Sequence, residues 1–238
     1  MSTFLDEFVE SYSNDSKYAL DSRLMSSWYP KRVREKAHGS SMLELGIGHG
    51  RTVAYFSEVF SNHVVIEGSE EVIRRYKKQF GEENTTIING FFEDFETKER
   101  FDCISMGFVL EHVNHPITIL AKFRKLLAPD GVIFIAVPSA TSLHRRLGFS
   151  AGLLSDMNKL GDGDRKLGHL RYYDINSLRE DVASAGLKEQ SIEGIFLKPF
   201  TTEQIAQLNL DPKILEALMV VGIDFPELCN AVLMEVTN

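Results

Sequence analysis

Three glycines spaced two residues apart, directly after an acidic residue, form the motif with the clearest chemical meaning in this sequence. The segment 42–52, MLELGIGHGRT, places Gly46, Gly48 and Gly50 behind Glu44 at the end of a short apolar run. Glycine has no Cβ and accepts positive φ, so such a loop lets the backbone approach a ligand closely. A helix that begins immediately afterwards presents unpaired N–H groups and the positive end of its dipole. The pattern is typical of a site for a nucleotide-type cofactor.

The spacing of these glycines separates the loop from two common nucleotide sites. A dinucleotide fingerprint requires G-x-G-x-x-G, and counted from Gly46 its third glycine position holds Arg51, with Gly50 one residue early. A P-loop requires Gly-Lys followed by Ser or Thr, and no such run follows the segment. The spacing therefore disfavours a nicotinamide-dependent oxidoreductase, which stays open as an alternative.

Histidine is the residue whose ordinary pKa best suits a general base near neutral pH. Of the seven histidines, three are candidates for this role: His112 after a predicted strand, and His144 and His169 in a later irregular segment. His38 and His63 precede predicted strands, so we expect both at the surface.

Short apolar strands alternate with amphipathic helices from residue 41 onward. Strands are predicted at 42–45, 63–68, 85–90, 101–107 and 131–138, with a helix directly after the glycine loop and another from Pro116, stopped by residues 129–131. Continuous apolar strands that alternate with helices predict a parallel sheet covered on both faces. Ligands of such sheets bind outside the carboxyl ends of the strands, which is where Gly46 and Glu67 fall.

The second half of the chain is less regular. Residues 139–173 show no clean period, a helix is predicted over 176–185 with a Ser177/Glu180 capping box, and a strand follows at 187–196. Residues 199–228 look helical and inserted, and 230–238 predicts a seventh strand that closes the sheet at an edge. At the other end, helices are expected over about 4–12 and 19–37, with Pro30 interrupting the second.

Several segments in order resemble one family. The E-x-G-x-G-x-G loop resembles motif I of the class I S-adenosylmethionine-dependent methyltransferases, and FDCISMGFVLEHVNHP (101–116) resembles the family's "FD…LEH" segment. The run 127–138 matches the region of the family's fifth strand. The segment 168–187 is similar to one found in small-molecule members, including the ubiquinone- and sugar-modifying groups, so the resemblance covers about residues 41–196.

This resemblance implies a fold and a domain layout. The expected fold is α/β: a Rossmann-like, seven-stranded, mostly parallel sheet with helices on both faces and the last strand antiparallel. We expect a single methyltransferase domain over 1–238, with an N-terminal helical cap at 1–40 and lid or substrate insertions at 139–175 and 197–228. The stretch 197–228 has three open roles, as core, lid or contact of a homodimer.

The resemblance also implies S-adenosyl-L-methionine as cofactor. Glu67 is expected on the ribose hydroxyls, Phe91 or Phe92 against the adenine with the other in the core, and the strand end at Met106 and Gly107 beside the methionine part. The full set of expected cofactor-binding residues is Glu44, Gly46, Ile47, Gly48, Gly50, Glu67, Gly68, Ser69, Gly90, Phe91, Phe92, Glu93, Met106 and Gly107.

The acceptor side is less defined. Residues 139–175 carry six basic residues against four aspartates, on a chain whose net charge is −8. Because arginine binds phosphate and carboxylate well, Arg145 and Arg171, with the neighbouring Tyr172, are expected to bind a small anionic acceptor. A solvated lid of mixed charge is the alternative.

Composition excludes several classes. The net charge of −8 argues against nucleic acid as the main partner, and the longest apolar run, at 132–137, is far too short to cross a bilayer. Two separated cysteines provide neither a disulfide framework nor a metal-ligand cluster, so we expect no metal and a cytoplasmic protein. The expected function is O- or N-methylation of a small molecule. Alternatives are the oxidoreductase, a methyltransferase acting on a macromolecule, and a non-catalytic cofactor-binding subunit.

Overall fold

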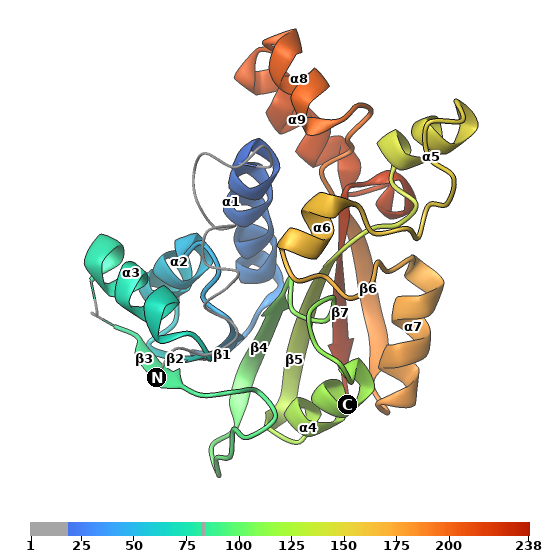
Figure 1. The fold of residues 1–238 in the computed structure, drawn as a ribbon. Coiled ribbons are helices and arrows are strands. Elements are labelled where there is room, and N and C mark those ends of the chain that lie inside the picture. The colour runs from blue at the N-terminus through green and yellow to red at the C-terminus, as the bar shows by residue number, and fades with distance from the viewer. Residues whose placement is uncertain (1–18, 82–83) are drawn as a thin grey trace.

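A seven-stranded sheet in the order β3-β2-β1-β4-β5-β7-β6 forms the centre of the protein (Figure 1). The structure is a computed structural model that describes residues 19–81 and 84–238. The strands are β1 (Ser41–Leu45), β2 (Asn62–Glu67), β3 (Thr86–Asn89), β4 (Phe101–Gly107), β5 (Leu127–Pro138), β6 (Lys188–Ile195) and β7 (Ala231–Thr237). The pairs among β1 to β5 are parallel, and β7 is antiparallel to both of its neighbours, which confirms the predicted fold class.

Helices cover both faces of this sheet because successive residues of its central strands are apolar and point alternately to the two faces. In β5, Ile133 and Ile135 pack toward α4 and α7, while Val132 and Phe134 pack toward α1 and α2. The helices are α1 (Ala19–Lys36), α2 (Arg51–Val59), α3 (Glu70–Phe80), α4 (Pro116–Arg124), α5 (Leu143–Ser150), α6 (Asp162–Lys166), α7 (Ile175–Ser184), α8 (Thr202–Leu208) and α9 (Pro212–Gly222), with a 3₁₀ turn at Pro226–Leu228.

The seventh strand does not close the sheet at an edge, and that prediction is wrong. Strand β7 lies between β5 and β6, with Ile133 paired to Val236 and Lys188 paired to Thr237. Its residues are almost continuously buried, as a central strand requires, whereas the first half of β6 is largely exposed. The edge strand is therefore β6.

Several predicted helix boundaries also differ from the structure. Helix α1 continues through Pro30, because burial of Tyr29, Pro30 and Val33 against the protein offsets the hydrogen bond that proline cannot donate. Helix α4 ends at Arg124, before residues 129–131, which lie inside the long strand β5. The predicted helix over 4–12 lies outside the described residues.

The Ser177/Glu180 capping box predicted for the beginning of α7 is wrong. Asp174 is the N-cap and accepts a hydrogen bond from the Ser177 amide at 2.8 Å, while the Ser177 hydroxyl takes the reciprocal position that was predicted for Glu180. Aspartate caps at least as well as serine, so the helix begins one turn earlier than the Ser177/Glu180 pairing implies.

The irregular segments form a layer beyond the carboxyl ends of the parallel strands. Residues 139–173 contain α5 and α6, and residues 199–228 contain α8 and α9; these helices gather at one end of the sheet (Figure 1). Among the helices that the structure describes, none is both long enough and apolar enough to cross a membrane.

Candidate active site

A cavity of about 970 Å³ opens at the carboxyl ends of β1, β2 and β4, beneath the layer of short helices. The glycine loop, the end of β2 and residues 90–93 line one half. The end of β4, the N-terminal half of α1 and residues of 139–172 and 198–203 line the other. This volume is at the upper end of the range for small-molecule sites, so it has room for two ligands side by side.

The glycine loop has the backbone conformation that its sequence predicts. Gly46, Gly48 and Gly50 have φ values of 82°, 51° and 75°, which non-glycine residues rarely adopt. Gly50 is also the N-cap of α2, and a Cβ there would lie 2.7 Å from the Tyr76 ring. The loop amides therefore lie at the cavity edge beside the beginning of a helix.

The Glu44 side chain, on β1 before the glycine loop, connects this strand to α2 and β2. Its carboxylate accepts a hydrogen bond from the Thr52 hydroxyl at 2.5 Å and lies 3.1 Å from Nε2 of His63. The expectation that His63 lies at the surface is wrong, because its side chain is fully buried between β1 and α2. Glu44 lines the cavity, but its two oxygens hold neighbouring elements in place.

Glu67 lies at the end of β2 and joins the loop to α3. Its two carboxylate oxygens accept hydrogen bonds from the backbone amides of Ile47 at 3.0 Å and Ser69 at 2.8 Å. Ser69 is the N-cap of α3, since its hydroxyl accepts from the Val72 amide. Ile47, Glu67, Gly68 and Ser69 all line the cavity.

The two phenylalanines after β3 have different environments. Both phenylalanines line the cavity; Phe91 is 39% exposed, whereas Phe92 is half-buried and also packs against the main core cluster. Gly90 and Glu93 line the same wall. Phe91 is therefore the more exposed of the two rings that a planar ligand could stack on.

At the end of β4, one of the two predicted residues faces the cavity. Gly107 lines it, while Met106 points to the opposite side and is fully buried in the core. A side chain at Gly107 would collide with the Tyr29 hydroxyl of α1. Tyr29 is a cavity residue that sequence reasoning missed; burial and the nearby Glu44 raise the pKa of its hydroxyl.

The three candidate histidines line the far half of the cavity. The His112 and His169 rings meet edge to face, with centroids 4.8 Å apart. Burial lowers the pKa of His112 to about 4 and that of His144 to about 3, with Lys198 and Arg145 contributing at His144. All three histidines are therefore neutral near pH 7, and their lowered pKa values make them weak bases.

Glu111, which sequence reasoning also missed, lies beside His112. It is fully buried, and neither carboxylate oxygen has a hydrogen-bond partner among the described residues. Burial raises its pKa to about 8. Its position in the "LEH" run was visible in the sequence, but its lack of a partner was not.

A buried ion pair closes the cavity between α1 and α8. Lys198 donates to Asp21 and to the Thr202 hydroxyl, which in turn donates to Asp21 at 2.8 Å. Residues 21 and 198 lie at opposite ends of the chain, so sequence spacing gave no signal for this contact.

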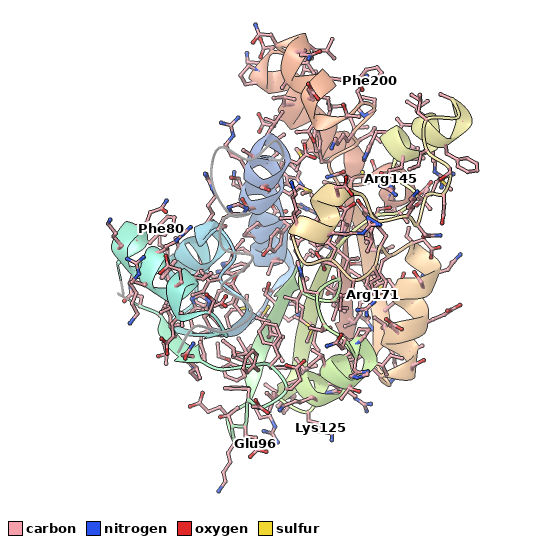
Figure 2. All side chains as sticks on the ribbon, viewed as in Figure 1. Phe80, Glu96, Lys125, Arg145, Arg171 and Phe200 are labelled. Atoms are coloured by element: carbon pink, nitrogen blue, oxygen red, sulfur yellow. The ribbon has the colours of Figure 1, made fainter. Side chains whose placement is uncertain are left out.

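The two predicted anion-binding arginines both donate to backbone carbonyls of the protein. Arg145 donates to the carbonyls of Met157 and Lys159 and lies 4.2 Å over the Tyr172 ring. Arg171 donates to the carbonyls of Leu110 and Val113 and is not among the cavity residues. Arg145 and Tyr172 do line the cavity. Figure 2 labels both arginines, Arg145 near α5 and Arg171 lower, beside the sheet.

Comparisons with known proteins agree with this geometry. The ubiquinone biosynthesis O-methyltransferase of Actinobacillus pleuropneumoniae serotype 7 (strain AP76) is 29% identical over 120 residues, 46% of this chain and 51% of that protein. A probable (S)-tetrahydroprotoberberine N-methyltransferase 2 of Papaver bracteatum is 27% identical over 45% of this chain and 31% of its own length. The chain thus spans about half the length, or less, of these curated relatives.

A solved structure extends the similarity to nearly the whole fold. The N-methyltransferase NodS of Bradyrhizobium japonicum WM9, in complex with S-adenosyl-L-homocysteine, matches with a TM-score of 0.62 and 15% identity, over 98% of this chain and 97% of that one. A family model described as a methyltransferase domain matches residues 18–192, well over half of the chain. With the glycine loop, the strand order and this match in agreement, the chain belongs to the class I S-adenosylmethionine-dependent methyltransferases.

Proposed function

We propose that the protein transfers a methyl group from S-adenosylmethionine to an oxygen or nitrogen atom of a small metabolite. The observation that carries the proposal is the preformed half of the cavity, in which three positive-φ glycines and an amide-oriented Glu67 lie on one edge. Membership of the methyltransferase family supports the choice of cofactor over a nicotinamide.

Each wall of this half has a role in the proposal. The Glu67 carboxylate would bind the ribose hydroxyls, Phe91 would stack on the adenine, and the loop amides and Gly107 would surround the methionine part. Bound there, the cofactor supplies a methyl group already activated by a sulfonium. The protein then mainly orients the acceptor for in-line displacement, an effect of up to ~7–11 kcal/mol.

We call the half of the cavity lined by the end of β4, α1 and residues of 139–172 and 198–203 the acceptor half. Its shape favours a small molecule over a macromolecule as the methyl acceptor. It is closed by the Asp21–Lys198 pair and by the lid that Arg145 holds together, so an acceptor must fit within the remaining part of 970 Å³. Because Arg145 and Arg171 donate to backbone carbonyls, the proposal does not include the anionic charge that their sequence positions suggested. An amine acceptor needs no base beyond solvent if it loses its proton before binding.

Calorimetric titration with S-adenosylmethionine, S-adenosylhomocysteine and NAD tests the donor side. We expect the first two to bind one per chain and NAD not to bind. Binding of NAD alone would show that the oxidoreductase alternative is correct.

Transfer of a labelled methyl group tests whether the protein is catalytic and which class of acceptor it methylates. With a methyl-labelled cofactor and a pool of small metabolites, label should enter a small product, and the Glu67→Gln variant should incorporate much less. Label only in protein or RNA added to the pool would overturn the small-molecule proposal. Cofactor binding with no transfer to any pool would favour a non-catalytic subunit.

A further inference from the structure

The acceptor half contains a cluster of three ligand-type side chains from two distant segments. Glu111 and His112 follow β4, and His169 lies in the loop after α6. One carboxylate oxygen and two imidazole nitrogens of this cluster all lie within 4.8 Å of one another. We propose that Glu111, His112 and His169 bind a single divalent transition-metal ion, Zn²⁺, at the acceptor side of the cavity.

The lack of hydrogen-bond partners at Glu111 supports the binding of an ion by this cluster. Both oxygens of the fully buried Glu111 have no hydrogen-bond partner in the part of the chain that the structure describes. A buried polar group without a partner destabilises the fold, and more so if it is charged. All three side chains line the cavity, so a ligand can reach them from solvent.

The distances allow coordination after small side-chain rotations. Nε2 of His112 lies 4.0 Å from Oε1 of Glu111. Zinc bonds to nitrogen and oxygen of ~2.0–2.2 Å place tetrahedral ligand atoms roughly 3.4 Å apart. The ligand atoms, which all lie within 4.8 Å of one another, must therefore move closer together by less than the length of one carbon–carbon bond.

Neighbouring groups orient the two imidazoles as they do in metal sites. The His112 ring hydrogen-bonds to the backbone of Gly168, and Nδ1 of His169 lies 3.7 Å from Asp164, whose carboxylate also accepts from the Tyr172 hydroxyl. Metal-binding histidines commonly use such carbonyl and carboxylate partners. The nearby Arg171 donates to the Leu110 and Val113 carbonyls and makes no hydrogen bond to the Glu111 oxygens.

The donor set selects the kind of ion. Two imidazoles and one carboxylate suit Zn²⁺ and other late transition metals, whereas Mg²⁺ and Ca²⁺ prefer oxygen ligands. Three protein ligands with further positions facing a cavity are typical of zinc sites that bind a substrate or water. The free cysteines Cys103 and Cys229 are buried and do not line the cavity.

The ion has a consequence that rests on the proposed function. An acceptor hydroxyl bound to Zn²⁺ would lose its proton to solvent more readily, as zinc-bound water does. Its oxygen would then form the bond to the methyl carbon while the carbon–sulfur bond breaks and leaves a neutral thioether. The site therefore favours oxygen acceptors, such as vicinal diols or catechols, over simple amines.

The test is calorimetric titration of the chelator-treated full chain with ZnCl₂, with MgCl₂ as the comparison salt. We expect one Zn²⁺ per chain and no measurable Mg²⁺ binding. Glu111→Gln and His169→Gln should each weaken Zn²⁺ binding beyond the ~10–100-fold typical of losing an outer partner of a metal ligand. His144→Gln, which changes a buried cavity histidine outside the cluster, should leave Zn²⁺ affinity unchanged.

Binding of S-adenosylhomocysteine by each variant shows that it is folded and separates the two proposals. If S-adenosylhomocysteine binds and Zn²⁺ does not, the metal site is wrong and the proposed function is unaffected. If Zn²⁺ binds and S-adenosylhomocysteine does not, the proposed function fails and the site is retained. Equal Zn²⁺ affinity in wild type, Glu111→Gln and His169→Gln would place the ion elsewhere and overturn the inference.

Discussion

The two halves of the cavity differ in whether their buried polar side chains have hydrogen-bond partners. The donor half is the one lined by the glycine loop, the end of β2 and residues 90–93. In the donor half, the Glu44 carboxylate is paired with Thr52 and His63, and the Glu67 carboxylate with two backbone amides. In the acceptor half, one oxygen of Asp21, the Ser26 hydroxyl and both oxygens of Glu111, together with a ring nitrogen each of His144 and His169, are buried without a hydrogen-bond partner among the described residues.

This difference indicates how each half is used. A half whose polar groups are bonded to one another keeps its shape without a ligand and suits one invariant cofactor. Buried polar groups that lack partners destabilise the fold, and in native proteins they occur mostly at functional positions. Under the proposed function the donor half is preorganised, and we expect the acceptor half to be completed by what binds there.

The largest effect should come from adding a methyl group to the donor loop. Gly50→Ala forces an alanine into φ of 75° and places its Cβ 2.7 Å from the Tyr76 ring. Left-handed backbone and overpacking together should lower the free energy of unfolding by ~2–5 kcal/mol in urea denaturation. The control is Gly152→Ala on the lid, which has φ of 72° but no atom near its Cβ, so it should lose only ~1–2 kcal/mol. Equal losses would show that the donor half is not tightly packed.

The next effect concerns cofactor affinity. Glu67→Gln places an amide group where two backbone amides donate, so one donor faces another and the ribose loses its acceptor. S-adenosylhomocysteine should bind ~30–100-fold more weakly by calorimetry, which corresponds to ~2–3 kcal/mol. Glu96→Gln is the control, because Glu96 is exposed at the opposite end of the protein from the α8 side marked by Phe200 (Figure 2). An unchanged affinity in Glu67→Gln would remove Glu67 from the cofactor site.

Acid should weaken the acceptor half through His144. Its pKa is lowered to about 3 by burial and by Lys198 and Arg145, whereas an unfolded histidine titrates near 6.5. The unfolded chain therefore takes up this proton first, and stability falls as pH drops below about 6.5. Between pH 7 and pH 5 the contribution is ~2 kcal/mol, and His144→Gln should reduce the pH dependence of unfolding by that amount. A variant with the same pH dependence as wild type would show that His144 is not held neutral.

The smallest effect separates the two neighbouring phenylalanines. Phe91→Ala should weaken S-adenosylhomocysteine binding by ~1–2 kcal/mol with little change in stability, because Phe91 lines the cavity and is 39% exposed. Phe92→Ala should mainly lower the melting temperature, since Phe92 packs on the core. The reverse pattern would exchange their roles.

The donor half was predictable because its signals are local. Positive-φ glycines, the strand that leads into them and the Ser69 cap are all encoded within a few neighbouring residues. Strand direction also followed, since β/α alternation constrains parallel sheets. Which of Met106 and Gly107 faces the cavity depends on which side of the sheet each residue of β4 points to. A short strand that is apolar on both faces does not reveal this in its sequence.

The acceptor half was not predictable in the same way. Its contacts join Asp21 to Lys198 and His112 to His169, pairs whose proximity depends on how the lid folds over the sheet. Placement of β7 inside the sheet likewise depends on the segment of α5, α6 and α7, which takes β6 one position beyond β5 and leaves the place between them to β7. The prediction that Arg145 and Arg171 bind an anionic acceptor takes no account of the backbone carbonyls to which both donate, because sequence alone does not show these contacts.

Hydrogen exchange with and without S-adenosylhomocysteine tests the division of the cavity most directly. Backbone amides of 44–52, 67–69 and 90–93 should become protected on binding, while those of 139–172 and 198–203 change little. That result would place the cofactor on the preorganised half and leave the other half for the acceptor. Protection confined to 139–172 and 198–203, with 44–52 unchanged, would contradict it.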